Sequence, residues 1–279
     1  MAADSATTRD APAGAPRRTA APRAPGLLAG RASGLLLVLA LLGLWQLSAM
    51  YWIESSNWPT LGAIARALWK GLESGELFTV FGSSLALMGS GYAIGTALAV
   101  ALGLLMAQVR LVRVALDPMV ELLRPIPVPA IIPPLILVLG VDNALKVFIV
   151  AFSVIFPVLV NTVAGVRAVE PVALDVARTL RVGRIATLWS VVLPASLPWM
   201  LAGMRISLAL ALIVTVVAEM IAGSSGIGFH IMTMQYAMRA DDMYAAIGLL
   251  AATGYALNRC FLAIERRAIH WYLAAGPRD

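Results

Sequence analysis

Charged residues are scarce in this chain. Only 13% of its 279 residues are Asp, Glu, Lys or Arg, and 60% are hydrophobic. Soluble domains carry about 25% charged residues, so a globule of this length would lack the polar side chains that its surface needs. The composition excludes an ordinary soluble domain and predicts an all-α polytopic membrane protein.

Cysteine and histidine are nearly absent too. The single Cys260 excludes an intramolecular disulfide, and with only His230 and His270 beside it no metal site is expected. We interpret Cys260 as a buried structural thiol. The phosphate-binding pattern G-x-x-x-x-G-K-S/T does not occur, so this chain alone cannot hydrolyse ATP by that route, and we expect it to bind no cofactor.

Basic residues outnumber acidic ones by 21 to 15, a balance that can indicate nucleic-acid binding. The arginines lie between apolar runs rather than on one face, so no nucleic-acid partner is predicted. Residues 1–31 are rich in Ala, Pro and Arg and are predicted to form a disordered cytoplasmic tail. The apolar run that follows is too long for a signal-peptide core and is predicted to be an uncleaved first span.

Six segments are long and apolar enough to cross a membrane, which takes about 20 residues in a helix. The predicted spans are residues 32–53, 77–109, 116–140 (the third lying within this range), 146–166, 199–222 and 243–261. Residues 54–76 contain an amphipathic stretch, predicted to lie as a helix on the outer membrane surface. The main transmembrane domain is residues 77–265, and residues 266–279 form a second cytoplasmic tail.

Prolines and glycines give the spans local features. Pro194 and Pro198 interrupt the uncharged run 185–204, so a straight helix is not expected there, and the fifth span is placed at about 199–222. The third span is predicted to be kinked by Pro125, Pro127, Pro129, Pro133 and Pro134. Close-packing positions in the second span are predicted at Gly89, Gly91, Gly95 and Gly103.

The basic residues are distributed asymmetrically between the loops. With both termini inside, the inner segments hold 15 of the 21 basic residues. The outer segments hold Arg66, Lys70, Lys146 and Arg239. Because Lys and Arg favour the cytoplasmic side, the chain is predicted to lie in a bacterial inner membrane with both termini cytoplasmic.

The longest inner loop, residues 167–198, is the candidate docking element. Pro171 can open a short helix over 172–180, Gly183 permits a turn, and 185–193 can form a second helix that ends before Pro194. A helix, a turn and a helix beneath the membrane suit either a docking element or an ordinary amphipathic loop, and the pattern alone does not decide between them.

Two stretches of this loop make the choice more specific. Asp175-Val-Ala-Arg-Thr-Leu-Arg181, followed by Val191-Val-Leu-Pro194, resembles the coupling motif of ABC-importer permeases. From about residue 77 to residue 272 the chain is similar to the nitrate/sulfonate/taurine-type branch of that family. The matching stretches are Leu123-Arg-Pro-Ile-Pro127, Ile131-Ile-Pro-Pro134, Asn161-Thr-Val-Ala-Gly165, Ala218-Glu-Met220, Ser225-Gly-Ile-Gly228 and Glu265-Arg-Arg267 before Trp271.

The resemblance implies a type I ABC-importer fold and a coupling role for residues of the inner loop. Ala177 is expected to face a tight contact with the ATPase. The implied coupling residues are Asp175, Val176, Ala177, Arg178, Thr179, Leu180, Arg181, Gly183, Leu193 and Pro194. Val176 replaces an alanine of the family motif, and Arg181 stands where the family has glycine, so the turn is expected to rely on Gly183.

The resemblance also implies partners and a substrate class. Two cytoplasmic ATPase subunits would carry ATP and Mg, a second copy of this chain would complete a homodimer among membrane lipids, and a periplasmic or lipid-anchored protein would deliver the solute. Relatives serve small, mostly anionic solutes such as sulfonates, taurine and nitrate. A vitamin or pyrimidine precursor is the alternative substrate.

Charged and polar residues at membrane depth are candidates for a translocation pathway. Glu121 and Arg124 are predicted to pair at i, i+3, and Asn161 lies in the fourth span. For Arg124 a structural role is the favoured alternative, because three prolines follow within five residues and leave backbone carbonyls free. Glu219 suits a pathway-lining role and a structural bond to a neighbouring helix equally well. Arg205 is too far from Glu219 along the helix to pair with it, at about 21 Å.

Two functions of other classes remain as alternatives. Gly223-Ser-Ser-Gly226 fits a short pattern of intramembrane serine proteases, but these enzymes need a histidine on a facing helix, and neither His230 nor His270 is placed so by the predicted topology. An ion-driven secondary transporter should show inverted repeats or paired broken helices, and neither is evident.

Overall fold

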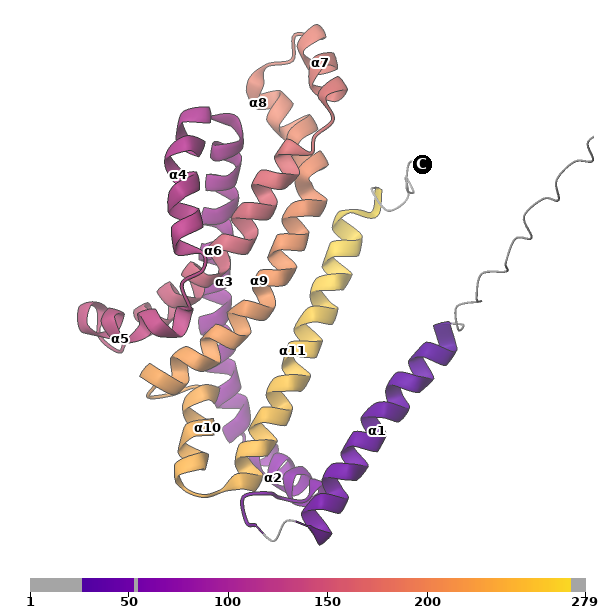
Figure 1. Ribbon diagram of the computed structural model, residues 1–279, viewed down its shortest axis with the longest axis vertical. Helices are drawn as coiled ribbons and strands as arrows, with labels where there is room; N and C mark the ends of the chain where they lie inside the picture. Colours follow the sequence, from indigo (N-terminus) through magenta and orange to yellow (C-terminus); the bar gives the residue numbers. More distant parts are fainter. Residues whose placement is uncertain (1–26, 53–54, 272–279) are drawn as a thin grey trace, which may run out of the picture.

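The computed structural model describes residues 27–52 and 55–271, and this part of the chain is helical without β-strands (Figure 1). The prediction of an all-α protein is confirmed. In chain order the elements are α1 (Leu27–Tyr51), α2 (Leu61–Glu73), α3 (Glu76–Gln108), α4 (Arg110–Leu123), α5 (Val128–Leu139), α6 (Asn143–Arg167), α7 (Pro171–Thr179), α8 (Arg184–Thr187), the π-helical turn η1 (Leu188–Val192), α9 (Leu193–Ala222), α10 (Ile227–Tyr236) and α11 (Ala240–Ala268).

Long apolar helices run along the length of the molecule. Figure 1 shows α7 and α8 at one end, hereafter the α7 end, and α2 and α10 at the other, the α10 end. Within the described residues five helical segments are long and apolar enough to cross a membrane, or six if the bent pair α4–α5 is one span. The second, fourth and sixth predicted spans correspond to α3, α6 and α11.

The third predicted span is more than kinked. It consists of two helices, α4 and α5, that meet at 101° across residues 124–127. Pro125 and Pro127 explain the break, because proline has no backbone N–H and disfavours helical backbone in the residue before it. Pro133 and Pro134 are accommodated inside α5, so the prolines before it, and not those within it, set the geometry.

The fifth span begins earlier than predicted. Helix is continuous from Arg184 to Ala222 over 39 residues, so the expectation that the segment ends before Pro194 is wrong. The widened turn η1 precedes Pro194, and the Leu193 N–H bonds to the Leu188 carbonyl five residues back. A π-helical turn removes the strain that a proline ring imposes on the turn before it, and the helix continues.

The ends of the chain and Cys260 also differ from the predictions. Residues 27–31 belong to helix α1 rather than to a disordered tail, while residues 1–26 and 272–279 lie outside the described part. Cys260 is exposed on α11 rather than buried. Near Cys260 this helix has little covering protein within the chain, so its apolar surface is available to lipid or to another subunit.

Close helix packing forms the core around α6. Helix α6 lies between α3, which runs parallel to it, and α9. Gly91, Gly95 and Gly103 on α3 face α6 so closely that a Cβ atom on Gly95 would lie 2.6 Å from the Ala151 carbonyl oxygen. Small residues allow helices to approach in lipid, where the hydrophobic effect does not drive them together. The predicted close packing is confirmed at these three glycines.

Gly89 is the exception in that prediction. A Cβ atom on Gly89 would meet nothing within 4 Å, and the residue is exposed. On the other side of α6, Gly165 faces Trp199 and Gly203 faces Asn161, so glycines also set the α6–α9 distance.

Aromatic residues join α1 to the rest of the molecule at the α10 end. The rings of Trp45 and Trp58 stack with centroids 3.8 Å apart, and Tyr244 of α11 packs edge-on against Trp45 at 5.3 Å. The Trp45 indole N–H donates to the Pro59 carbonyl, and Thr60 caps α2 through a bond from the Ala63 N–H. The short helix predicted between the first two spans is present as α2.

The α3–α6 contact yields a prediction. Gly95→Ala places a methyl group against Ala151 backbone atoms that cannot rotate away, and overpacking of this kind costs about 1–3 kcal/mol. Gly89→Ala is the matched control, because it makes the same chemical change on the same helix in open space. The thermal unfolding midpoint of the detergent-solubilised protein should fall for Gly95→Ala and not for Gly89→Ala, and equal midpoints would refute the close approach.

Candidate functional site

The loop at the α7 end has the predicted helix–turn–helix form. Pro171 opens α7, which ends at Thr179 with Leu180 as its C-cap. The Val182 N–H donates to the Ala177 carbonyl at 2.9 Å, and the Arg181 N–H donates to the Arg178 carbonyl at 3.0 Å. This bond pair is the Schellman arrangement, which needs a left-handed residue just beyond the helix.

Arg181 is that left-handed residue. Its φ is 55°, whereas Gly183 has an ordinary φ of −63°. The prediction that the turn relies on Gly183 is therefore wrong, and Arg181 adopts the backbone conformation at the position where the resembled family carries glycine. A left-handed conformation costs a residue with a Cβ atom about 1–2 kcal/mol.

The two faces of α7 differ in burial. Ala177 is 4% exposed and faces the chain itself, so the expectation that it meets a partner is wrong. Val172, Val176 and Leu180, which form the α7 patch, are 65%, 52% and 70% exposed. Their spacing of four residues puts them on one side of the helix, and exposed apolar patches mark interaction surfaces.

Polar contacts within α7 are local. The Arg178 guanidinium lies 2.8 Å from the Asp175 carboxylate, with both side chains largely exposed. The Thr179 hydroxyl donates to the Asp175 carbonyl. Leu193 and Pro194 are partly buried in the first turn of α9. They lie beyond η1 and thus outside the exposed part of the loop.

The first group of predicted pathway residues lies near the α4–α5 break. Glu121 and Arg124 line one cavity of about 280 Å³ together with Asp117 and Arg167, but among the described residues no hydrogen bond or ion pair joins them, so the predicted pair is wrong. Arg124 also lines a second cavity with Asn161. The Asn161 amide donates to the Pro157 carbonyl of its own helix.

Glu219, the fourth predicted pathway residue, is buried in a network of hydrogen bonds. The Ser84 hydroxyl lies 2.8 and 2.9 Å from its two carboxylate oxygens, and the Gly228 N–H donates to Oε2 at 3.0 Å. The Ile227 N–H in turn donates to Ser84 Oγ. Glu219 therefore ties α9 to α3 and to the start of α10, which favours the structural alternative left open by the sequence.

Glycines let the chain fold over this carboxylate. Gly226 has a φ of 99°, and a Cβ atom there would collide with the Glu219 carboxylate, while one on Gly228 would meet the Val216 carbonyl. The stretches Ala218–Met220 and Ser225–Gly228 thus form one unit, the Glu219 latch (Glu219, Ser84 and residues 226–228). Arg205 is not part of it, since its guanidinium reaches Asn258 instead.

A cavity of about 390 Å³ adjoins the latch. Lys146 and Glu219 are buried in its wall, each 2% exposed. The more exposed polar residues around it are Ser83, Ser90, Asn143 and Ser225. From the sequence, Lys146 is predicted only as a basic residue of an outer segment. It is one of just two lysines in the chain, and this rarity is a signal that could have identified it.

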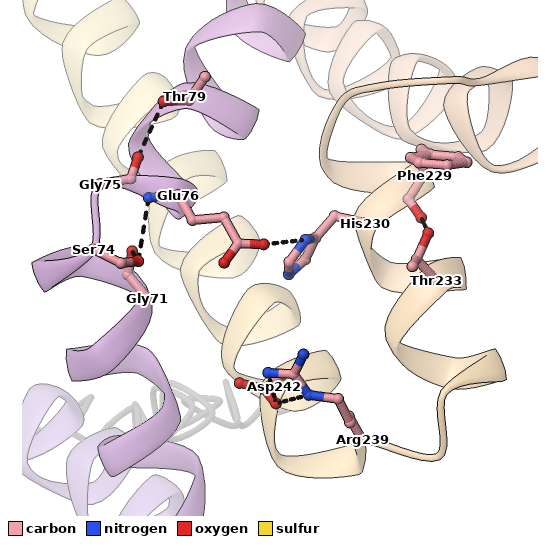
Figure 2. A network of polar contacts seen from close by, with 10 residues as sticks. All are labelled: Gly71, Ser74, Gly75, Glu76, Thr79, Phe229, His230, Thr233, Arg239 and Asp242. Carbon is pink, nitrogen blue, oxygen red and sulfur yellow. Dashed lines mark hydrogen bonds and ion pairs between the residues drawn. The ribbon is translucent and has the colours of Figure 1, made fainter.

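Ser225 and His230, considered for a protease, border a shared cavity, but among the described residues no hydrogen bond joins them. His230 Nδ1 instead lies 3.5 Å from Glu76 Oε1, as Figure 2 shows, linking α10 to the start of α3. Nearby, Arg239 pairs with Asp242 at 2.7 Å at the start of α11. The histidine is occupied in a contact between helices, and no serine is paired with a base here.

The Glu219 latch can be tested with two positive-φ glycines. Gly226→Ala strains the backbone and displaces the carboxylate, whereas Gly140→Ala strains the backbone at a φ of 74° in open space. We expect Gly226→Ala to be the less stable by about 2 kcal/mol or more, since hydrogen bonds to a charged group contribute about 1.5–3 kcal/mol each.

Thermal unfolding of the purified variants provides the measurement for this test. Glu219→Gln should also lower stability, because an amide NH₂ cannot accept the bonds that one carboxylate oxygen accepts. Equal losses in Gly226→Ala and Gly140→Ala would show that the carboxylate does not hold the loop.

Comparisons with known proteins agree with this architecture. The chain is 31% identical over 243 residues to a putative aliphatic sulfonates transport permease protein of Bacillus subtilis, covering 87% of this chain and 88% of that one. It is 33% identical over 161 residues to the taurine transport system permease protein of Escherichia coli, covering 58% of each. A bicarbonate transport system permease protein of Synechococcus elongatus is 30% identical over 70% of each chain.

Among solved structures, the inward-facing methionine ABC transporter MetNI superposes with a TM-score of 0.59 at 16% identity, covering 75% of this chain and 97% of that chain. That similarity supports the fold alone. The family described as binding-protein-dependent transport system inner membrane component matches residues 99–269. With the helical bundle, the broken α4–α5 span and the projecting α7 loop, this match shows that the chain belongs to that family of ABC-importer permeases.

Proposed function

We propose that this chain is the translocation subunit of an ATP-driven importer for a small anionic solute, and that the α7 patch docks on a separate cytoplasmic ATPase. The observation that carries the proposal is the α7 loop, which projects from one end of the bundle with three apolar side chains exposed. The permeases of sulfonate, taurine and bicarbonate systems among the relatives support a solute that carries an anionic group.

The structure of α7 indicates which of its faces contacts the ATPase. Ala177 is held inside the loop by burial and by its carbonyl bond to Val182, so Val176 takes the outward position. A valine there adds apolar area to the contact, and the left-handed turn at Arg181 directs the chain back toward α8. The coupling element thus comprises the outer face of α7 and not the whole set of residues proposed from the motif.

The assembly we propose contains two copies of this chain, two ATPase subunits and a solute-binding protein on the outer side. One α7 loop per chain provides one docking contact, and two ATPases then need two loops. Closure of the ATPases would move the loops together and switch the bundle between outward and inward access, a rigid-body transition between two states.

The orientation we propose places the α7 end in the cytoplasm. The α3–α4 connection, the α7 loop and the carboxyl end of α11 all lie toward that end (Figure 1), and these segments carry most of the arginines of the described chain. Positive residues favour the cytoplasmic side. Both termini would then be cytoplasmic, and α2 and α10 would face the binding protein.

Docking is tested by Val176→Asp. A charge in the centre of an apolar contact should reduce retention of the co-expressed ATPase on the affinity-purified permease by about tenfold or more, since central interface residues contribute about 1.4 kcal/mol or more each. Met238→Asp is the control, an equally drastic change at an exposed residue of the α10 end. Full retention by Val176→Asp would contradict the proposed docking face.

Arg181→Gly complements that test. It removes the left-handed strain and should keep the ATPase bound, with the loop more stable by about 1 kcal/mol. Loss of the ATPase in this variant would instead show that the guanidinium itself contacts the partner.

Orientation is tested by cysteine labelling in intact cells. Because Cys260 is exposed, the variants need a Cys260→Ser background. Cysteines at Ser74 and Arg239 should react with an impermeant thiol reagent, and a cysteine at Arg184 should react only after the membrane is opened. Labelling of the Arg184 variant in intact cells would reverse the orientation.

A further inference from the structure

We propose that the cavity beside the Glu219 latch is a binding site for a small, singly charged oxyanion, such as a sulfonate or carboxylate group, with Lys146 as its counter-charge. The inference rests on the proposed function and adds to it a place inside the permease where the solute is held. The site lies between α3, the first turn of α6 and the end of α9.

Lys146 is the residue that points to a ligand. Its side chain is 2% exposed, lines the cavity, and within the described residues has no hydrogen bond and no ion pair within 4.0 Å. A lysine side chain enclosed to this degree without a close counter-charge is costly, and ionisable residues in transmembrane segments mark solute or ion sites by default. An anion in the cavity would supply the missing partner.

Glu219 shares the cavity and attracts Lys146 electrostatically, so it is the competing explanation for the lysine. Its carboxylate, however, already accepts hydrogen bonds from Ser84 and Gly228. It lies more than 4.0 Å from the ammonium, and the Gly226 backbone packs directly against it. The three N–H donors of the Lys146 ammonium are therefore available to a ligand.

The surroundings suit an anion. Ser83 and Ser90 on one face of α3 now donate to the carbonyls of Val80 and Leu87, and their hydroxyls can rotate toward a ligand. The amino end of the 25-residue α6 borders the cavity at Asn143, and its Asp142 makes no side-chain cap. The aligned peptide dipoles at a helix amino end are equivalent to about half a positive charge, which adds to that of Lys146.

The volume of the cavity limits the size of the ligand. A volume of about 390 Å³ lies at the lower end of small-molecule pockets, about 300–1,000 Å³. The cavity lies closer to the α10 end than to the α7 end, since its residues come from the amino-terminal half of α3, the start of α6, the last turn of α9 and the loop after it. A solute released by an outer binding protein at the α10 end would therefore reach this site before it reached the α7 end.

The experiment measures anion binding to the detergent-purified permease–ATPase complex in the absence of any binding protein. The labelled anions ethanesulfonate, nitrate and bicarbonate, and the sulfonate-bearing zwitterion taurine, are titrated by equilibrium dialysis, with choline as the cationic control. The wild type should bind at least one of the anions and not choline. Lys146→Met, which keeps the side-chain length and removes the charge, should weaken that binding by about tenfold or more, and Lys146→Arg should retain part of it.

Two further variants separate the explanations. Lys70→Met removes the other lysine of the chain, which is exposed on α2, and should bind the anion as the wild type does. In the double variant Lys146→Met with Glu219→Gln the cavity is neutral again. If Lys146 served only to balance the charge of Glu219, the double variant would bind the anion again. If Lys146 contacts the anion, the double variant would still fail to bind it.

The outcomes are distinct. No anion binding by the wild type, unchanged binding by Lys146→Met or restored binding in the double variant would each overturn the anion site. Failure of the wild-type permease to retain an ATPase would instead refute the proposed function, because that result does not depend on Lys146.

Discussion

The close approach of α3, α6 and α9 is the constraint on which the rest of the structure depends. In lipid, apolar side chains gain little by leaving their surroundings, so helices associate where their shapes fit. Gly91, Gly95 and Gly103 bring α3 against α6, and Gly165 and Gly203 bring α9 against its other side. This rigid three-helix core holds the Glu219 latch at one end and carries the α7 loop at the other.

The less regular parts are attached to that core. The α4–α5 break turns the chain through 101° and opens the cavities around Arg124 beside α6. The loop from α9 to α10 is joined to α3 and α9 by hydrogen bonds to Ser84 and to a buried carboxylate. Since a buried carboxylate is stable only when its hydrogen bonds are satisfied, the same latch fixes the wall of the Lys146 cavity.

Transport in this family requires that events at the two ends be linked, and the bundle provides a direct physical route. Helix α6 runs from the Lys146 cavity to the start of the α7 loop, and α8, η1 and α9 return as one continuous helical segment from that loop to the latch. Movement of the α7 loop would act on α6 and α9, two of the three helices that border the proposed anion site. The π-helical turn before Pro194 is the point at which that return helix departs from regular geometry.

The sequence by itself determined the membrane class, the long apolar helices, the amphipathic α2, the inner helix–turn–helix and the family, because these follow from composition, helical spacing and local motifs.

Tertiary structure decided which face of each element is used. Ala177 is buried and Val176 exposed, Gly89 is free while Gly95 is packed, and Glu121 does not reach Arg124. The turn at Arg181 and the helix through Pro194 also departed from prediction, since backbone hydrogen bonding can offset an unfavourable residue preference. Lys146 and Glu219 are 73 positions apart in the sequence, and only the packing of α6 on α3 and α9 brings them into the wall of one cavity.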